Sequence, residues 1–453
     1  MTFSFAEGAW ALRGRAVLEN AVVDDAVVAV QGDRIRFAGP VGSAPGELAA
    51  LVGSAEHWHG LILPGLVDIH CHGGGGQSFP DAESPADALV AVMEHRRHGT
   101  TSLVASLVTD RPEALLRQTA LLAALAEVGE LTGIHLEGPF LSAARCGAQD
   151  PAKMLAPDPG LVTAVAAVAK GFFATMTVAP ELPGIISSAG DGALSVIEAL
   201  ASVGAVPSFG HTDCTAEQLG SAVQAARLAL ARASSAGVAA VGAGPVGAVV
   251  ADSVLAGSAS GADDDGIGQV RAGAARSPRP TATHLFNGMR PIHHRQPGPV
   301  LECLAQAAGG DMAVELVADG VHLDPRTVAD VFKLAAPGAV LLVTDAMAAA
   351  GMADGAYQLG PMAVTVTDGV ARLTDGGAIA GGTAHLIDVV RSTVRASRVP
   401  LAAAVRAASS TPAGVLGIAG EVGSLAAGLR ADLLLTDAGL TPVRVYRAGN
   451  LVA

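Results

Sequence analysis

Two histidines stand two residues apart in the segment Pro64-Gly-Leu-Val-Asp-Ile-His-Cys-His-Gly. The apolar run from Leu66 to Ile69 predicts a strand, and side chains alternate across a strand, so Asp68, His70 and His72 would share one face. Two imidazoles at the end of a strand suit a divalent metal ion. The alternative is a strand end that carries two hydrogen-bonded histidines and no ion.

Four further polar residues close short apolar segments later in the chain. Glu137 precedes a Gly-Pro turn, His211 and His284 each end a short segment beside small or polar residues, and Asp345 ends Val-Leu-Leu-Val-Thr. Each has a structural explanation when taken alone, although a buried carboxylate would need a partner. His135 lies two residues before Glu137, on the same predicted face, where it either supports the site or only packs.

The elements between these residues decide whether they meet. From about residue 63 to 415, short strands alternate with Ala/Leu-rich helical stretches, which predicts parallel strands. About eight such units over some 350 residues favour a closed (β/α)₈ barrel over an open sheet. Catalytic groups of such barrels gather at the C-terminal ends of the strands, so one metal centre explains the whole set.

The two ends of the chain differ from its middle. Residues 1–62 and 416–453 contain short β-branched or alternating runs broken by Gly and Asp, and we expect them to pair into a small β-sandwich domain beside the barrel. Residues 233–280 consist mostly of Ala, Gly, Ser, Val and Asp, which predicts a low-complexity surface insertion in the barrel, flexible in part.

Composition excludes several classes of protein. The chain has 453 residues, 28 basic against 42 acidic side chains and a formal net charge of -14, which argues against nucleic acid or an anionic membrane as the main partner. Four cysteines make no disulfide framework and suit a reducing compartment. No signal peptide or bilayer-spanning stretch is visible, so the expected location is the cytoplasm.

The strand-end residues and their order resemble the amidohydrolase superfamily of metal-dependent barrels. Five local segments are similar to one of its families, the N-acetylglucosamine-6-phosphate deacetylases: His135-Leu-Glu-Gly-Pro-Phe, Gly210-His-Thr, Thr283-His-Leu-Phe-Asn-Gly-Met, Ala318-Asp-Gly-Val-His and Val343-Thr-Asp-Ala. The resemblance covers nearly the whole chain outside the insertion, and it implies the barrel predicted above.

The resemblance also implies a ligand set. Glu137, His211 and His284 would hold the principal metal ion, and His70 and His72 could hold a second, which leaves one or two divalent ions per chain. Zn²⁺ fits the nitrogen and oxygen ligands, and Fe²⁺, Mn²⁺ or Co²⁺ fit nearly as well.

The implied reaction is hydrolysis of the acetamide of N-acetyl-D-glucosamine 6-phosphate, an amino-sugar phosphate. Asp345 would take a proton from the attacking water and pass it to the departing amine. The residues that would contact substrate are Ala148, Asn287, Gly288, Arg295, His322, Ile379, Ala380 and Gly381. Arg295 would reach the phosphate of the neighbouring subunit in a homodimer, unless it is an ordinary solvated loop arginine. Gln149 departs from the family, which commonly has a histidine there.

Three alternatives remain open at this point. The same chemistry on N-acetylgalactosamine 6-phosphate cannot be separated by sequence. Another amidohydrolase acting on a different amide would often use a carboxylated lysine, but Lys153, Lys170 and Lys333 stand in no strand-end motif. A barrel kept as a binding scaffold would have lost Asp345 or a ligand, and none is lost.

Overall fold

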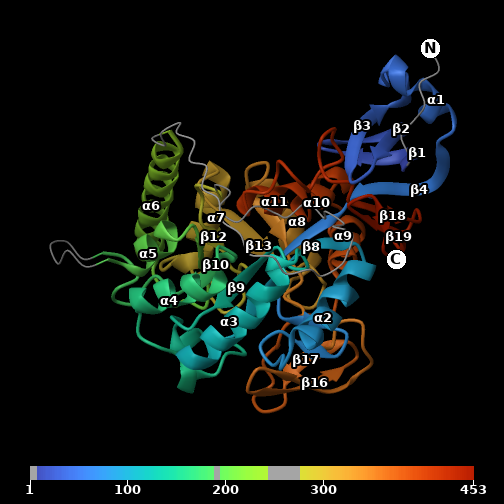
Figure 1. Ribbon diagram of the computed structural model, residues 1–453. Helices are drawn as coiled ribbons and strands as arrows, with labels where there is room; N and C mark the ends of the chain where they lie inside the picture. Colours follow the sequence, from blue (N-terminus) through green and yellow to red (C-terminus); the bar gives the residue numbers. More distant parts are fainter. Residues whose placement is uncertain (1–7, 188–193, 243–275) are drawn as a thin grey trace, which may run out of the picture.

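The centre of the molecule is a barrel of eight parallel strands, seen in the computed structural model of Figure 1. The structure describes residues 8–187, 194–242 and 276–453, with the backbone alone for residues 236–242. The strands lie in the order in which they follow one another along the chain. They are β5 (Leu66–Cys71), β8 (Thr100–Leu107), β9 (Gly133–Glu137), β10 (Phe173–Val178), β11 (Val206–Phe209), β12 (Thr281–Ala282), β13 (Ala313–Leu316) and β14 (Val340–Leu342).

The barrel closes between the C-terminal end of β5 and the residues just beyond β14. The amide of Asp345 donates to the carbonyl of His70 over 2.9 Å, and the amide of His72 donates to the carbonyl of Ala346 over 2.7 Å. Cys71 and Ala346 form a parallel bridge at the same place. The seam of the barrel therefore runs through the segments that carry His70, His72 and Asp345.

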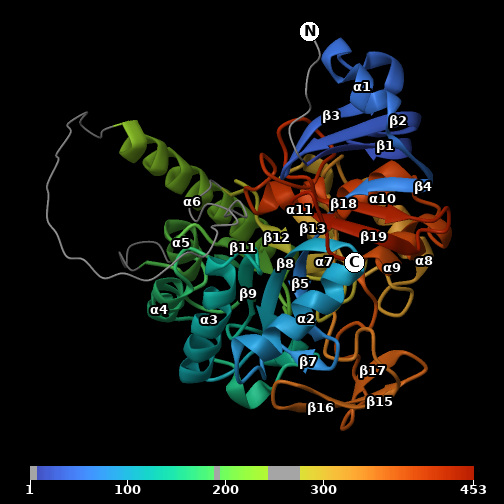
Figure 2. The ribbon, with the colours of Figure 1, turned by 45° about the vertical axis from the view of Figure 1, so that its right-hand side comes forward.

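Helices cover the outside of the barrel, as Figures 1 and 2 show. Every residue of the eight strands is buried, as expected for parallel strands that are covered on both faces. The helices are α2 (Pro85–Arg97), α3 (Pro112–Glu127), α4 (Pro159–Ala169), α5 (Val196–Ser202), α6 (Ala216–Gly242), α7 (Gly298–Gly309), α8 (Pro325–Leu334), α9 (Leu386–Arg395), α10 (Leu401–Ala407) and α11 (Ser410–Val415).

Strands from both chain ends pair into one mixed sheet of seven, beside the barrel in Figure 2. The N-terminal and C-terminal parts meet where β4 and β18 run antiparallel, with Leu63 opposite Leu434. The strands are β1 (Ala9–Leu18), β2 (Ala21–Gln31), β3 (Arg34–Pro40), β4 (Glu56–Pro64), β18 (Leu433–Thr436), β19 (Pro442–Arg447) and β20 (Asn450–Leu451), with the short helix α1 (Ala49–Gly53) against them.

Two small sheets follow strands of the barrel. The hairpin of β6 (Gly73–Gly74) and β7 (Gln77–Ser78) comes after β5. After β14, the strands β15 (Gly355–Leu359), β16 (Met362–Thr367) and β17 (Val370–Leu373) form an antiparallel sheet that projects from the barrel in Figure 1. Leu359, at the end of β15, and Ile379, in the segment after β17, both line the pocket at the C-terminal mouth of the barrel.

At both ends of the predicted low-complexity insertion, the structure differs from the prediction. Helix α6 continues to Gly242, eleven residues past the end of the helical pattern at Ala231, because alanine-rich sequence has high helix propensity. At the other end, the guanidinium of Arg276 donates to the carbonyls of Ala174 and Gly204, over 3.2 and 2.7 Å. Residues 243–275 lie outside the described residues.

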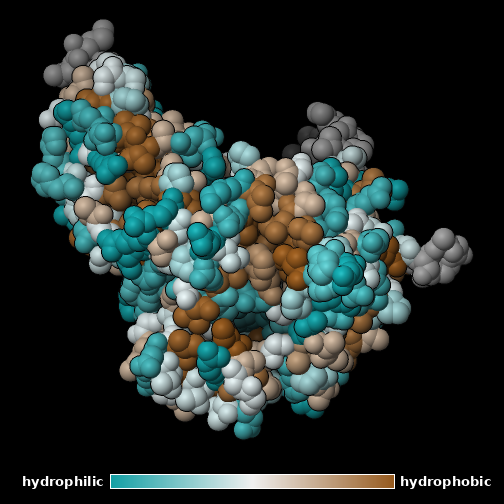
Figure 3. All heavy atoms as spheres, turned by 180° about the vertical axis from the view of Figure 1, so that it is seen from behind, coloured by the Kyte–Doolittle hydropathy of each residue, from teal (hydrophilic) through white to brown (hydrophobic). Residues whose placement is uncertain are grey.

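The surface mixes hydrophilic and hydrophobic residues, with brown patches on the small domain and over the barrel in Figure 3. Among the residues that the structure describes, no helix has both the length and the apolar character to cross a bilayer.

Candidate metal centre and substrate pocket

Glu137, His211 and His284 meet at the mouth of the barrel, where β9, β11 and β12 end. Oε1 of Glu137 lies 2.8 Å from Nε2 of His211 and 2.8 Å from Nε2 of His284, and the two ring nitrogens are 3.2 Å apart. All three side chains are buried. The arrangement offers one carboxylate oxygen and two imidazole nitrogens to a common point, a ligand set that suits Zn²⁺ and other divalent ions.

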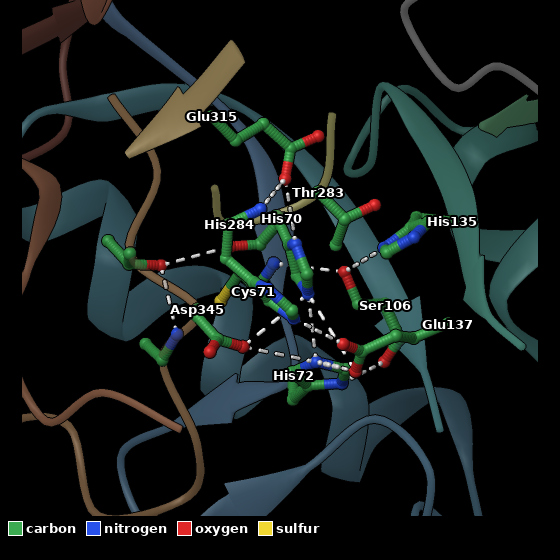
Figure 4. A network of polar contacts seen from close by, with 12 residues as sticks. His70, Cys71, His72, Ser106, His135, Glu137, Thr283, His284, Glu315 and Asp345 are labelled. Atoms are coloured by element: carbon green, nitrogen blue, oxygen red, sulfur yellow. Dashed lines mark hydrogen bonds and ion pairs between the residues drawn. The ribbon is translucent and has the colours of Figure 1, made fainter. Parts of the chain in front are cut away.

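His70, His72 and Asp345 form a second group beside the first (Figure 4). Nε2 of His70 and Nε2 of His72 are 3.1 Å apart, and each lies 3.4 Å from Oδ1 of Asp345. The other oxygen of Glu137, Oε2, is 3.1 Å from Nε2 of His72. Glu137 thus faces both groups, one oxygen toward each.

The hydrogen bonds behind the rings fix which nitrogens are free. Nδ1 of His72 lies 3.2 Å from the carbonyl of Ser106, and Nδ1 of His211 lies 2.8 Å from the carbonyl of Arg145. A carbonyl only accepts, so these Nδ1 atoms carry a proton, and in the neutral ring that binds a metal ion Nε2 would present the lone pair. Nitrogen lone pairs that converge repel one another unless a cation lies between them. The residues therefore fit a divalent metal ion.

Three of these residues have a backbone conformation that L-amino acids rarely adopt. The φ angles are 47° for His211, 27° for His284 and 48° for Asp345. Each residue lies two or three positions after its strand, where the left-handed turn directs its side chain into the mouth of the barrel. Such conformations cost on the order of 1–3 kcal/mol each and persist where the surrounding structure enforces them, commonly at functional sites.

Two opposing effects, burial and contact with close partners, set the pKa values of the carboxylates in the site. Burial would raise the pKa of Glu137, but contacts with His211, His284 and His72 outweigh it and hold the pKa well below its ordinary value. For Asp345, burial is likewise outweighed by the histidines, and its pKa is lowered. Both carboxylates are therefore ionised at neutral pH.

His135 is buried beneath the two groups and contacts neither by hydrogen bond. Its Nδ1 and Nε2 each lie 2.9 Å from a hydroxyl, of Ser106 and Thr177 respectively. Burial and the neighbouring His70 lower its pKa well below the ordinary value, so the ring is neutral. Its ring meets that of His70 edge to face, at 4.5 Å between centroids, which supports the orientation of His70 by packing.

The sequence reasoning missed Glu315, a buried carboxylate on β13. Its Oε2 lies 3.1 Å from Nδ1 of His70 and accepts the amide of His284 over 3.3 Å (Figure 4). A carboxylate behind a metal-binding histidine fixes the ring and raises its basicity. The signal was available, because Glu315 is the one charged residue in the apolar run Ala313-Val-Glu-Leu-Val.

A pocket opens in front of these groups, and most of the predicted substrate residues line it. Oδ2 of Asp345 lies 3.9 Å from Nε2 of His322, whose Nδ1 is held by Asp319 at 2.9 Å. Burial lowers the pKa of His322, but this hydrogen bond outweighs it and the pKa is raised. The predicted residues that line the pocket are Ala148, Asn287, Gly288, His322, Ile379 and Gly381.

Two predicted substrate residues are absent from the pocket lining among the residues described. Ala380 is fully buried beside it, and Arg295 is exposed on the loop between His284 and α7. Gln149 does line the pocket, where its Nε2 donates to Oε2 of Glu137 over 2.6 Å and its Oε1 accepts the amide of Thr109 over 2.8 Å. Its amide therefore orients the ligand carboxylate without being able to act as an acid.

The sequence profile described as the amidohydrolase family matches residues 61–452. The chain belongs to the amidohydrolase family. Within that family it is similar to N-acetylglucosamine-6-phosphate deacetylases, of which a mutant from Mycobacterium smegmatis has been solved in complex with N-acetyl-D-glucosamine 6-phosphate. That chain shares 35% identity with this one at a TM-score of 0.78, and the match covers 98% of this chain and 99% of that chain.

Two curated relatives carry related names. The N-acetylglucosamine-6-phosphate deacetylase of Mus musculus is 30% identical over 402 residues, 86% of this chain and 83% of the mouse protein. The N-acetylgalactosamine-6-phosphate deacetylase of Escherichia coli O157:H7 is 28% identical over 419 residues, 90% of this chain and 93% of that protein.

Proposed function

We propose that the protein hydrolyses N-acetyl-D-glucosamine 6-phosphate to glucosamine 6-phosphate and acetate, in amino-sugar catabolism and cell-wall recycling. The proposal rests on the observation that the predicted metal ligands and the predicted base lie together at one pocket. Two groups of side chains that suit metal ions lie beside one another with Glu137 facing both, and Asp345 of the second group lines the pocket. The similarity to named deacetylases over nearly the full chain selects the substrate class.

Each residue has a place in the reaction. Glu137, His211 and His284 would hold the principal divalent ion, and His70 and His72 a second. The bound ion would polarise the acetamide carbonyl and lower the pKa of a water molecule so that hydroxide exists near neutral pH.

Asp345 moves the proton. Its carboxylate, ionised and 3.4 Å from the ring nitrogens of His70 and His72, accepts a proton from the attacking water. The same oxygen then gives that proton to the amine that leaves. His322, at the same end of the pocket, would bind the sugar, and Asn287 and Gly288 would offer side-chain and backbone hydrogen bonds near its phosphate.

Arg295 would complete the phosphate site of a neighbouring subunit. The side chain of Arg295 is exposed and, unlike Asn287 and Gly288 of the same loop, does not line its own pocket among the described residues, which supports a homodimer in which it reaches across. A guanidinium suits phosphate because it offers two parallel hydrogen bonds.

Zn²⁺ is the ion that we propose, and two ions per chain are favoured by the opposite orientations of the two oxygens of Glu137. We also propose a division into a small β domain (1–62 and 416–453) and a barrel (63–415), which the presence of two large sheets supports. All four cysteines are free thiols, which supports a reducing compartment such as the cytoplasm.

The test is acetate release from a panel of N-acetylated sugars, with and without a 6-phosphate. We expect N-acetylglucosamine 6-phosphate to have the highest kcat/KM, activity to disappear after chelation and to return with Zn²⁺. A preference for N-acetylgalactosamine 6-phosphate would select the second candidate, which the Escherichia coli relative favours. Full activity in metal-free protein would contradict the mechanism.

A further inference from the structure

A second cluster of metal-binding side chains lies outside the pocket. Glu94 and His98 stand one turn apart at the C-terminal end of α2, and His385 immediately precedes α9. Oε1 of Glu94 lies 2.9 Å from Nε2 of His385 and 3.4 Å from Nδ1 of His98. One ligand atom from each residue falls within 4.8 Å of the others.

His385 is placed between two carboxylates. Its Nδ1 lies 3.3 Å from Oδ2 of Asp388, while its Nε2 faces Glu94. A neutral imidazole has one N–H, so one of its nitrogens presents a lone pair to a negative oxygen. A cation between Nε2 and Glu94 removes that repulsion. The contact of Nδ1 with Asp388 is then the carboxylate support that metal-bound histidines usually have.

His98 offers the third ligand atom. Nδ1, the nitrogen nearest to Oε1 of Glu94, also lies 2.8 Å from the carbonyl of Glu94 and donates to it, so the ring would bind an ion through Nε2 after turning. The rings of His98 and His385 are stacked, 3.6 Å between centroids and 13° between planes. Because a lone pair lies in its ring plane, one ring must turn out of the stack to share an ion. His98 has the space to turn, since 37% of its side chain is exposed.

The electrostatic surroundings favour a cation. Glu94 and Asp388 contribute two carboxylates, whereas one arginine, Arg391, contacts Asp388 on its other oxygen.

We propose that Glu94, His98 and His385 form a further divalent metal site, separate from the catalytic centre. Two histidines and one glutamate are a ligand set that Zn²⁺ takes in proteins. The site is built against the loop that follows Asp345, because a Cβ added to Gly351 would stand 2.2 Å from Oε1 of Glu94. An ion held there ties α2 and α9 to that loop and has a structural role.

The experiment counts ions. Metal-free wild type, Glu94→Gln and His98→Ala are dialysed against Zn²⁺, and the ions bound per chain are measured by mass spectrometry. His59→Ala, which removes an exposed histidine of β4, is the matched control. We expect each cluster variant to bind one ion fewer than wild type and control. We also expect the variants to keep the kcat of the wild type, because neither Glu94 nor His98 lines the pocket.

Thermal unfolding gives a second measurement. Added Zn²⁺ should raise the Tm of the wild type more than that of the two cluster variants, because an ion that binds only the folded state stabilises it. His98→Ala carries the test if Glu94→Gln fails to fold, since the side chain of His98 is partly exposed. Equal ion counts in wild type and His98→Ala would overturn the proposal and leave a hydrogen-bonded cluster only. The deacetylation assay is independent of this count, so the two proposals fail separately.

Discussion

Glu315 offers the sharpest test of how the barrel supports its metal centre. Glu315→Gln keeps the shape of the side chain and one accepting oxygen but removes the charge. At present one carboxylate oxygen serves both Nδ1 of His70, at 3.1 Å, and the amide of His284, at 3.3 Å. These two residues belong to the two different groups of ligands, so a single substitution should affect both.

The size of the effect follows from the kind of hydrogen bond that is lost. A bond to a charged group contributes about 1.5–3 kcal/mol and a neutral one about 0.5–1.5 kcal/mol, so the variant should lose about 1–1.5 kcal/mol in holding His70. That is about tenfold in metal affinity, the lower end of the range of about 10–100-fold for supporting partners of metal ligands. Glu315→Ala would leave both buried donors without a partner and should also lower the Tm.

Zn²⁺ affinity is measured by competition with a chromophoric chelator, together with kcat/KM for acetate release. Glu113→Gln, an exposed carboxylate on α3, is the control for loss of one negative charge. We expect weaker Zn²⁺ binding in Glu315→Gln and wild-type binding in the control. Equal affinities in the two variants would refute the view that Glu315 acts through His70.

Four further outcomes are expected. Asp345→Asn should lower kcat by at least roughly 100-fold with metal still bound, and a wild-type rate would assign the proton transfer to another group. Arg295→Ala should raise KM for the phosphorylated sugar and hardly change the unphosphorylated one, and hybrids with Asp345→Asn chains should regain activity if Arg295 acts across subunits. Cys146 should react first with a thiol reagent, because burial raises the pKa of Cys214 to about 12 and raises those of the other two thiols, Cys71 and Cys303, so Cys146→Ser should be resistant. Arg276→Ala should lower the free energy of unfolding by about 1–3 kcal/mol, measured by denaturant titration, because Arg276 bonds carbonyls at the end of the barrel opposite the site.

The sequence was sufficient to predict which side chains meet at the mouth of the barrel, because their signals are local. Each ligand follows a short apolar segment, and parallel strands bring such positions to one end of a barrel whatever the length of chain between them. His211 and His284 are 73 residues apart in sequence, yet their Nε2 atoms lie 3.2 Å apart. A long separation in sequence is therefore no argument against the prediction that these two residues meet.

The features that escaped prediction depend on contacts between distant segments. Glu315 has no spacing relation to His70, and only the closed barrel places them together. The sheet of β15–β17 comes from exposed, alternating strands with weak sequence signals. The sequence around His385 predicts only the start of a helix. Its contacts with His95 and His98, at the C-terminal end of α2, depend on how two separate helices pack.

The seam between β5 and β14 has a consequence for folding. Residues near position 70 and residues near position 345 join there, so the first and last strands of the barrel must meet before Asp345 can approach His70 and His72. Contacts between segments that are far apart in sequence have the largest entropic cost of loop closure, so they form slowly. A growing chain that has emerged only as far as β13 carries five of the ligands and no base. The onset of acetate release during refolding would therefore time the closing of the barrel, whereas helix formation measured by circular dichroism would precede it.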